Sequence, residues 1–319
     1  MIDLHVHSTF SDGSMTPEEL VDLAMKCGLS ALALTDHDTT EGIESLLEAG
    51  ERACRDSESG NRTLTCIPGV EMSVAVERGT MHILGYFIDA GNRELESLLA
   101  RVRGGRNERN EKILSRLCEL GLSLEMSEVL GFAGDGVVGR PHFARALVEK
   151  EYVKSHQAAF EKYLAKGRPA YVDRYRPDAR ESIEVISNAG GVPAVSHPST
   201  LGLGPKALRV VLEELIGAGL QGIEAYYSEH SPEVERKYVE LADSLGLVAT
   251  GGSDFHGDLN PAIRLGRGFG RLRVPDSVVD ELRERKVSRR DAPQEAGRAR
   301  LIRPAEIAEG RDGCPARER

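Results

Sequence analysis

The chain has 319 residues, 40% hydrophobic and 29% charged, which is typical of a globular protein large enough for an α/β domain with an insertion. A net charge of −10 argues against a general nucleic-acid coat protein, because such proteins bind through many contacts from cations to phosphates; it does not exclude a nucleotide or an RNA end as substrate. Neither a transmembrane run nor a secretory signal is predicted, and the five cysteines form no Cys-x-x-Cys pair, so we expect a cytoplasmic protein with free thiols.

The first predicted strand, residues 2–7, carries two histidines, His5 and His7. Side chains alternate across a strand, so both imidazoles lie on one face and can chelate one metal ion. Such a pair alone is a weak signal, but Asp12 follows shortly after it. A helix is then predicted from the capping box that begins at Thr16 to Gly28.

Further short strands are predicted with amphipathic helices between most of them, at residues 31–35, 65–68, 82–87, 192–196, 222–226, 248–250 and 269–274. This alternation indicates the α/β class, with a mainly parallel sheet or a barrel. Strand signals are absent from 92–171, where we expect an all-helical insertion. The expected division is therefore a first barrel part (1–91), the insertion (92–171), a second barrel part (172–286) and a disordered tail (287–319).

Potential metal ligands recur at or just after the ends of predicted strands: His7, His37, Glu71, His197, Asp254 and His256. In (β/α) barrels the loops after the strands form the active site, so residues far apart in sequence converge there. This pattern predicts a metal site. His82 lies within a predicted strand, and a buried structural histidine is the alternative for it.

These motifs resemble those of the PHP (polymerase and histidinol phosphatase) superfamily of metal-dependent phosphoesterases, and most closely its TrpH-like (YciV-like) group. The motifs are His5-Val6-His7, Asp12, Thr35-Asp36-His37, Gly69-Val70-Glu71, His82, Ser196-His197-Pro198, Ser253-Asp254-Phe255-His256, and the insertion segments 139–144 and 166–172. The resemblance covers residues 1–285. It implies a distorted (β/α)7 PHP barrel with an all-helical insertion domain and three metal ions.

The resemblance also implies which residues hold each ion. The first metal takes His5, His7, Glu71 and Asp254; the second takes Glu71, His82 and His197; the third takes Asp12, His37 and His256. A mixed shell of imidazoles and carboxylates suits Mn²⁺, with Zn²⁺ or Fe²⁺ as alternatives. The positive charge of three divalent ions exceeds the negative charge of three carboxylates, so an anionic substrate such as a phosphate ester is expected. A metal-bridged hydroxide, held by Glu71, Asp254 and His197, is the expected nucleophile.

Residues outside this set are expected to hold the substrate. Arg140 precedes a predicted helix and can bind a phosphate through two hydrogen bonds, although a structural salt bridge is the alternative. Lys166, Arg168 and Ser73 complete the expected substrate-binding set. His142 is a candidate acid for the leaving group, with an ordinary helix-face histidine as the alternative. Asp36 is expected to orient ligands from outside the metal shell.

The resemblance implies hydrolysis of nucleotide phosphate esters: the 3′-phosphate of nucleoside 3′,5′-bisphosphates, 5′→3′ exonucleolytic cleavage of short 5′-phosphorylated RNA, or both. Histidinol-phosphate phosphatase activity, an amide-hydrolysing barrel and a non-catalytic PHP module of a polymerase or regulatory complex are the alternatives. The only expected partner is the nucleotide or short-RNA substrate. We expect no stable nucleic-acid complex, no membrane and no obligatory protein partner.

Overall fold

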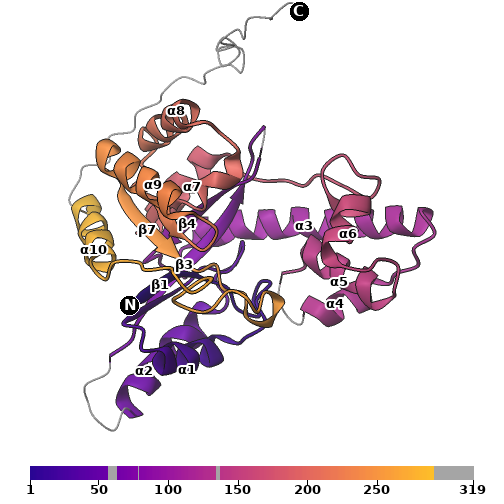
Figure 1. Cartoon of the computed structure of the whole chain (residues 1–319), viewed down its shortest axis with the longest axis horizontal. Helices are drawn as coiled ribbons and strands as arrows, with labels where there is room; N and C mark the ends of the chain where they lie inside the picture. Colours follow the sequence, from indigo (N-terminus) through magenta and orange to yellow (C-terminus); the bar gives the residue numbers. More distant parts are fainter. Residues whose placement is uncertain (57–62, 78, 134–136, 291–319) are drawn as a thin grey trace, which may run out of the picture.

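The computed structural model describes residues 1–56, 63–77, 79–133 and 137–290. Seven strands form one sheet in sequence order: β1 (Ile2–Val6), β2 (Ala31–Leu34), β3 (Thr65–Val74), β4 (Met81–Tyr86), β5 (Val192–Val195), β6 (Gly222–Tyr227) and β7 (Val248–Gly252). The sheet curls into a nearly closed barrel (Figure 1). The His7 amide donates to the Phe255 carbonyl at 3.0 Å and the Asp254 amide to the His5 carbonyl at 2.9 Å, which joins β1 to the chain after β7.

The strand directions differ from the parallel arrangement at one place. β4 pairs antiparallel with both β3 and β5, whereas the other neighbouring strands pair in parallel. A short connection can join only antiparallel neighbours, and few residues separate β3 from β4. β3 is also longer than the predicted 65–68, so Glu71 lies inside a strand rather than after one.

Helices cover the outside of the barrel. They are α1 (Pro17–Cys27), α2 (Ile43–Asp56), α7 (Ala179–Asn188), α8 (Pro205–Ile216), α9 (Pro232–Leu245) and α10 (Ser277–Arg290), with short 3₁₀ turns η2 (Pro198–Leu201) and η3 (Gly257–Leu259). The predicted capping box at Thr16 is present, and Gly28 ends α1 with φ 72°. The strand predicted at 269–274 is wrong, because that segment is turns and loop. α10 includes the first four residues of the predicted tail, and 291–319 lie outside the described residues.

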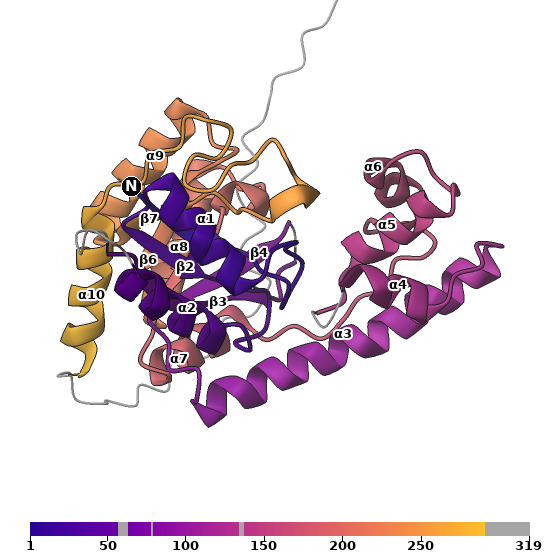
Figure 2. The ribbon, with the colours of Figure 1, turned by 90° about the horizontal axis from the view of Figure 1, so that it is seen from below.

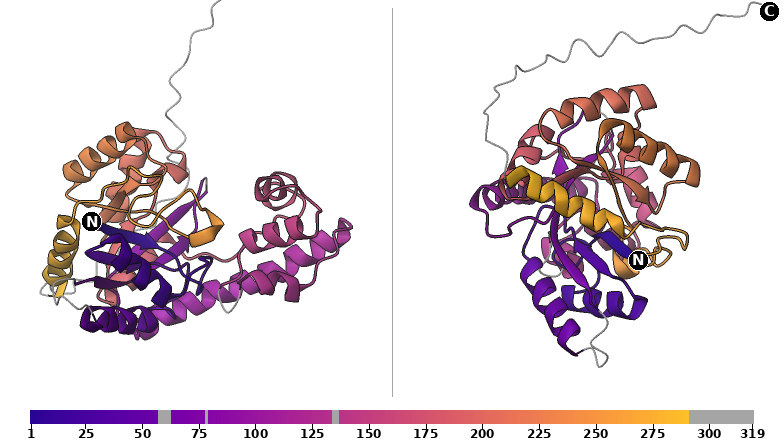
Figure 3. Two further views of the ribbon diagram at one scale, coloured as in Figure 1. Left: turned by 60° about the horizontal axis from the view of Figure 1, so that its bottom comes forward. Right: turned by 90° about the vertical axis from the view of Figure 1, so that its left-hand side faces the viewer.

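Between β4 and α7, the described elements are all helical: α3 (Arg93–Glu119), α4 (Met126–Ala133), α5 (Arg140–Glu149), α6 (His156–Ala159) and the π-helical turn η1 (Phe160–Leu164). Figure 2 shows α3 extending away from the barrel with α4, α5 and α6 on its far half, and Figure 3 (left) shows the same separation. Leu98 near the start of α3 joins the barrel core, whereas Leu117 joins a second core with Phe143 and Leu147 of α5. One helix therefore connects two hydrophobic cores.

The opposite end of the molecule is covered by α10, which crosses the barrel next to the N-terminus (Figure 3, right). Val278 and Leu282 of α10 pack in one core cluster with Ile2 and Leu4 of β1. This packing places α10 away from the strand ends that carry the predicted ligands. Within the described part of the chain, no helix combines the length and apolarity that a membrane span requires.

Candidate metal centre

His5 of β1 and His7, which directly follows β1, lie side by side in the barrel. Both are fully buried, and their Nε2 atoms are 3.1 Å apart. Oδ1 of Asp254 lies 3.4 Å from Nε2 of His5 and 3.1 Å from Nε2 of His7. Oε2 of Glu71 lies 3.4 Å from both nitrogens. The alternation of side chains at the end of β1 places the two imidazoles together, and β3 and the chain after β7 add the two carboxylates.

Glu71 lies at the centre of the whole ligand cluster. Its Oε1 is 2.8 Å from Nδ1 of His82 and 2.9 Å from Nε2 of His197. Its Oε2 is 2.9 Å from Nδ1 of His37. A carboxylate whose two oxygens face different histidines has the arrangement that a bridging ligand requires.

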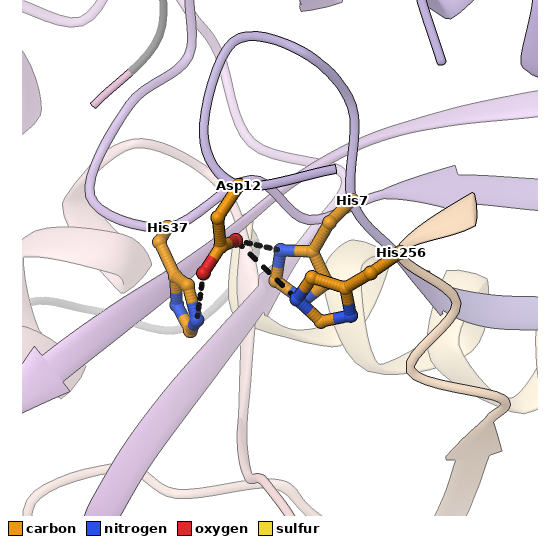
Figure 4. A group of neighbouring side chains, drawn as sticks. All are labelled: His7, Asp12, His37 and His256. Atoms are coloured by element: carbon orange, nitrogen blue, oxygen red, sulfur yellow. Dashed lines mark ion pairs between the residues drawn. The ribbon is translucent and has the colours of Figure 1, made fainter. Parts of the chain in front are cut away.

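A further group surrounds Asp12. Figure 4 shows its carboxylate between His37 on one side and the rings of His7 and His256 on the other. Oδ1 of Asp12 is 3.3 Å from Nε2 of His256, and Oδ2 is 3.9 Å from Nε2 of His37. His7 stacks on His256 with ring centroids 4.2 Å apart, so the group around Asp12 adjoins the pair formed by His5 and His7.

All nine expected ligands therefore meet at one edge of the barrel. Three sets have nitrogen and oxygen atoms within 4.8 Å of one another: His7, Asp12, His37 and His256; His5, His7 and Glu71; and His37, Glu71 and His82. His37 was expected only beside Asp12 and His256, but it also contacts Glu71. His82 reaches the site because β4 runs opposite to its neighbours, so its beginning lies where the parallel strands end.

The proton positions suit metal binding. Nδ1 of His5 is 2.9 Å from Oε1 of Glu224, which holds a ring proton there, so that in the singly protonated ring the Nε2 lone pair is directed at the cluster. Nδ1 of His256 is likewise 2.9 Å from the Asp254 carbonyl, so loss of the Nε2 proton would leave a lone pair facing Asp12. Oδ1 of Asp12 is buried without a hydrogen bond. Such inward-facing lone pairs are what a divalent ion would use, so the residues fit metal ions.

The electrostatics of the ion-free cluster agree with this at Glu71 and His7, whereas nearby carboxylates raise the pKa of His5, His37, His197 and His256, so that an entering ion would displace protons there. Burial would raise the pKa of Glu71, but the surrounding His37, His82 and His5 hold it well below its usual range. Burial, together with the nearby His256, lowers the pKa of His7 to about 3, so this ring stays neutral at ordinary pH. Ionised carboxylates and a neutral imidazole are the forms that bind metal.

A carboxylate that the sequence interpretation missed holds several of these groups. Glu224 on β6 is fully buried; its Oε2 accepts from the His197 amide at 2.7 Å and from the Ser196 hydroxyl at 3.2 Å. With the contact to His5, it links the first and second expected metal positions. Its place inside a predicted strand was a signal, because a lone acid in an apolar strand needs a buried partner. Asp36, which was expected to orient metal ligands, accepts hydrogen bonds from the hydroxyl groups of Ser8 and Ser11.

A cluster of arginines adjoins the ligands. Asp38, next to His37, accepts from Nε of Arg106 at 2.9 Å and from Arg174 at 3.4 Å, and also from the Ser73 amide at 2.8 Å. Arg109 is 4% exposed, and its described hydrogen bonds go to neutral oxygens. In the sequence these arginines belong to two basic stretches, at 101–116 and 162–176, which were expected to supply a pocket for a substrate phosphate. The structure brings Arg106 of the first stretch and Arg174 of the second to the same carboxylate.

The expected substrate-binding residues differ in position. Arg140 is half-buried; it donates to the Leu164 carbonyl at 3.2 Å and lies over the Tyr171 ring, so its described contacts include no salt bridge. Its pKa is lowered by burial and by Arg176 and Arg106 nearby. Lys166 and Arg168 are exposed beyond η1, and no described interaction connects either to the ligand cluster.

His142 is buried at the start of α5. Its Nδ1 accepts from the Gly139 amide at 3.0 Å, which places the ring proton on Nε2. Burial lowers its pKa, so the ring is neutral at ordinary pH. A neutral imidazole is a hydrogen-bond donor but a poor proton donor.

Comparison with known proteins identifies the family. A model of the PHP domain matches residues 3–164. The chain is 37% identical over 264 residues to a 3′,5′-nucleoside bisphosphate phosphatase of Chromobacterium violaceum, covering 80% of this chain and 87% of that protein. It is 35% identical over 265 residues to the 5′-3′ exoribonuclease Rnm of Escherichia coli, covering 83% and 88%.

A solved structure supports the same conclusion. An amidohydrolase from Chromobacterium violaceum, with bound sulfate and no metal, superposes with a TM-score of 0.77 at 33% identity, covering 89% of this chain and 96% of that one. The expected barrel fold and the resemblance to PHP phosphoesterases are thereby confirmed. The chain belongs to the PHP domain family and is a metal-dependent hydrolase of phosphate esters.

Proposed function

We propose that this enzyme hydrolyses nucleotides and short RNAs that carry a second phosphate near the one attacked. The substrates are nucleoside 3′,5′-bisphosphates, which lose the 3′-phosphate, and short 5′-phosphorylated RNA, which is cut from its 5′ end. The observation that carries this proposal is the excess of buried positive charge beside the ligand cluster. The named activities of the two curated relatives agree with such substrates.

The charge excess follows from the contacts. Arg106 and Arg174 share the single carboxylate of Asp38, while Arg109 has no carboxylate among its described partners. Burial and the charges of Arg106 and Arg174 lower the pKa of Arg109 to about 8. Since arginine stays protonated in proteins, this shift measures a buried cation that lacks a counterion. Three cations beside one carboxylate have an excess positive charge that a phosphate dianion would neutralise. Arginine binds phosphate through paired hydrogen bonds.

Three divalent ions, with Mn²⁺ expected and Zn²⁺ or Fe²⁺ as alternatives, would occupy the ligand cluster. His5, His7, Glu71 and Asp254 would hold the first, Glu71, His82 and His197 the second, and Asp12, His37 and His256 the third. Bound there, the ions would neutralise phosphate charge and lower the pKa of water. The protein holds the ligands in place. The arginines would bind one phosphate of the substrate and orient it so that the phosphate to be hydrolysed reaches the ions.

Other residues would act on the substrate directly. Ser73 lies beside Glu71 on the same face of β3, and its hydroxyl is 3.3 Å from a guanidinium nitrogen of Arg106, so it can bind the same phosphate. His142, neutral with its proton on Nε2, would donate a hydrogen bond rather than protonate the leaving group. Arg140 would extend the cation cluster from α5. Lys166 and Arg168 would contact the more distant part of a bound nucleotide.

The test compares substrates that differ in the second phosphate. The Mn²⁺-loaded enzyme should release phosphate from adenosine 3′,5′-bisphosphate at least about 100-fold more efficiently than from adenosine 3′-phosphate, because the latter leaves buried arginines unpaired. It should also shorten 5′-phosphorylated RNA. Equal efficiency on both mononucleotides would contradict the role of the arginines, and hydrolysis of histidinol phosphate alone would overturn the nucleotide proposal.

We further propose that the helical segment 92–171 works as a cap domain, because it contributes Arg106, Arg109 and Arg140 to a site built on the barrel. The enzyme would act in the cytoplasm without an obligatory protein partner. Support for that compartment comes from the cysteines: Cys27, Cys54, Cys66 and Cys118 are free thiols, and Cys314 lies outside the described residues.

A further inference from the structure

A cavity of about 300 Å³ lies on the Asp12 side of the ligand cluster. Ser11 and Gly13, which flank Asp12, form one wall, while Phe132 of α4 and Arg145 of α5 belong to the opposite wall. This volume is at the lower end of the range for small-molecule sites. The cavity, named here the α5 pocket, therefore opens beside a metal ligand at the junction of barrel and helical segment.

The junction is anchored at this place. The Val137 amide, which precedes α5, donates to the Phe10 carbonyl in the loop that carries Asp12, at 3.2 Å. This hydrogen bond holds the wall from the helical segment against the wall from the barrel. The α5 pocket is thus positioned together with the ligand cluster.

The beginning of α5 separates the α5 pocket from the arginine cluster. An α-helix turns by about 100° per residue, so His142 and Arg145, three residues apart, share a face, and Arg140 points away from His142. The contacts agree with this geometry. Arg140 reaches the Leu164 carbonyl and the Tyr171 ring, whereas His142 and Arg145 line the pocket. A substrate held by the arginines would pass the metal ligands before reaching the α5 pocket.

The chemistry of the pocket suits a nucleotide. The guanidinium of Arg145 lies 5.0 Å from the centre of the Phe132 ring. Because Arg145 is exposed, its side chain can turn toward a bound ligand. Aromatic rings and arginine planes both stack on nucleobases, and the arginine also attracts the phosphate backbone. Ser11 and Ser14 add hydroxyl groups to the lining.

We infer that the α5 pocket binds the second nucleotide of a short 5′-phosphorylated RNA. This inference rests on the proposed function and deepens it. Water adds its hydroxyl to phosphorus, the bond to the 3′-oxygen of the first nucleotide breaks, and that oxygen takes the remaining proton. The phosphate therefore stays on the 5′-oxygen of the second nucleotide. A nucleoside 3′,5′-bisphosphate has only a terminal phosphate oxygen at this position, so it leaves the α5 pocket empty.

The test uses this difference between the two substrates. Wild-type enzyme, Arg145→Ala and Phe132→Leu are each assayed with Mn²⁺ on adenosine 3′,5′-bisphosphate and on the 5′-phosphorylated diadenosine. We expect kcat/KM on the dinucleotide to fall roughly 5- to 100-fold in each variant, the range for loss of one stacked base. On the bisphosphate both variants should match the wild type within about twofold. Lys154→Ala, which removes an exposed cation outside the pocket lining, should change neither rate.

Every other pattern contradicts the inference in a recognisable way. If the variants cleave the dinucleotide as well as the wild type, the pocket does not bind it. If both variants lose activity on both substrates equally, the residues support the whole site. If the wild type hydrolyses the bisphosphate but not the dinucleotide, the pocket assignment fails while the phosphatase proposal stands. If it hydrolyses neither, the proposed function itself fails.

Discussion

At the scale of single residues, the site depends on strained positions that specific contacts stabilise. Positive φ values occur at His197 (23°), Asp254 (56°) and Asp38 (56°). This backbone conformation strains a residue that has a side chain by on the order of 1–3 kcal/mol. In each case the backbone amide donates a hydrogen bond: that of His197 to Glu224 at 2.7 Å, that of Asp254 to the His5 carbonyl at 2.9 Å and that of Asp38 to the Glu71 carbonyl at 3.0 Å. The ligand cluster therefore holds the very backbone that positions it.

Glu71 is the residue whose change should be most damaging. Glu71→Gln keeps the shape but replaces one carboxylate oxygen by an NH₂ group that cannot bind metal, so phosphate release should fall by at least about 10³-fold. Glu41→Gln, at an exposed position, should retain full activity. The measurement is kcat/KM on adenosine 3′,5′-bisphosphate, with circular dichroism to confirm folding. Near-normal turnover by Glu71→Gln would contradict the bridging role.

Glu224 is not one of the expected metal ligands, but it should control the affinity of the site for metal ions through its contacts with His5 and His197. In Glu224→Gln one side-chain oxygen becomes a donor, so His5 and the His197 amide cannot both keep their acceptors. Mn²⁺ affinity should fall roughly 10- to 100-fold, as for other residues that orient metal ligands. Calorimetric titration with Mn²⁺ checks this. Glu229→Gln in the exposed loop after β6 is the control, and equal affinities of the two variants would refute the idea.

Metal uptake should depend on pH through His256. Although burial opposes it, Asp12 and Asp254 raise the pKa of His256 to about 10 in the ion-free protein. Below that pH an entering ion must displace a proton, so affinity should decrease by up to about tenfold for each unit that the pH falls. Titrations at pH 7 in buffers of different ionisation enthalpy measure the released proton. Affinity that rises as the pH falls would have the wrong sign.

At the scale of elements, closure of the barrel decides which side chains meet. β1 lies so close to β7 that a Cβ on Gly252 would be 2.3 Å from the His5 backbone nitrogen. The reversed β4 brings His82 to the same edge as Glu71 on β3. α3 then carries Arg106 and Arg109 from the barrel toward the second core. Each element thus has a catalytic consequence that its own periodicity does not show.

Gly252→Ala tests barrel closure directly. The added methyl meets backbone atoms, which cannot turn away, so the free energy of unfolding should decrease by about 1–3 kcal/mol or more. Gly104→Ala is the matched control: it lies in α3 with open space around it and should stabilise the protein by about 0.5–1 kcal/mol. Urea unfolding of the metal-free proteins gives both values. Equal effects of the two changes would show that β1 and β7 do not need this close approach.

At the scale of the whole molecule, the barrel supplies the ligands and the helical segment supplies cations. The arginine cluster lies where the two meet, with Asp38 from the barrel between Arg106 of α3 and Arg174 of the returning chain. The cost of burying these cations is the reason to expect an anion there. Substrate binding should therefore stabilise the contact between the two parts.

This leads to a prediction on stability. Phosphate at 100 times its dissociation constant should increase the free energy of unfolding of the metal-free wild type by about 2.7 kcal/mol, and so raise its melting temperature. Arg109→Met should lose most of this gain, yet be no less stable than the wild type without phosphate, because an uncompensated buried charge is removed. Arg52→Met, at an exposed position on α2, should respond to phosphate like the wild type. A normal phosphate response in Arg109→Met would argue against the anion site.

The sequence by itself determined the chemistry and much of the order of elements. Residue type and short-range periodicity are local properties, so the buried strand that leads to His5 and His7, the capped helix α1 and the lack of strands in the described residues between β4 and β5 could all be predicted. The same locality explains the failure at 269–274, where an apolar alternation lies in turns. Strand length and direction were also beyond local patterns.

Only the tertiary structure decided which distant groups share one space. Glu224 is 219 residues from its partner His5, and Asp38 is 136 residues from Arg174. Such contacts arise when the barrel closes and the segment between η1 and α7 returns the chain to it, and the cost of burying an unpaired charge then selects the partners. The ligands could be predicted because each follows a local motif, whereas their supporting carboxylate, the arginine cluster and the α5 pocket depend on how the two cores are joined.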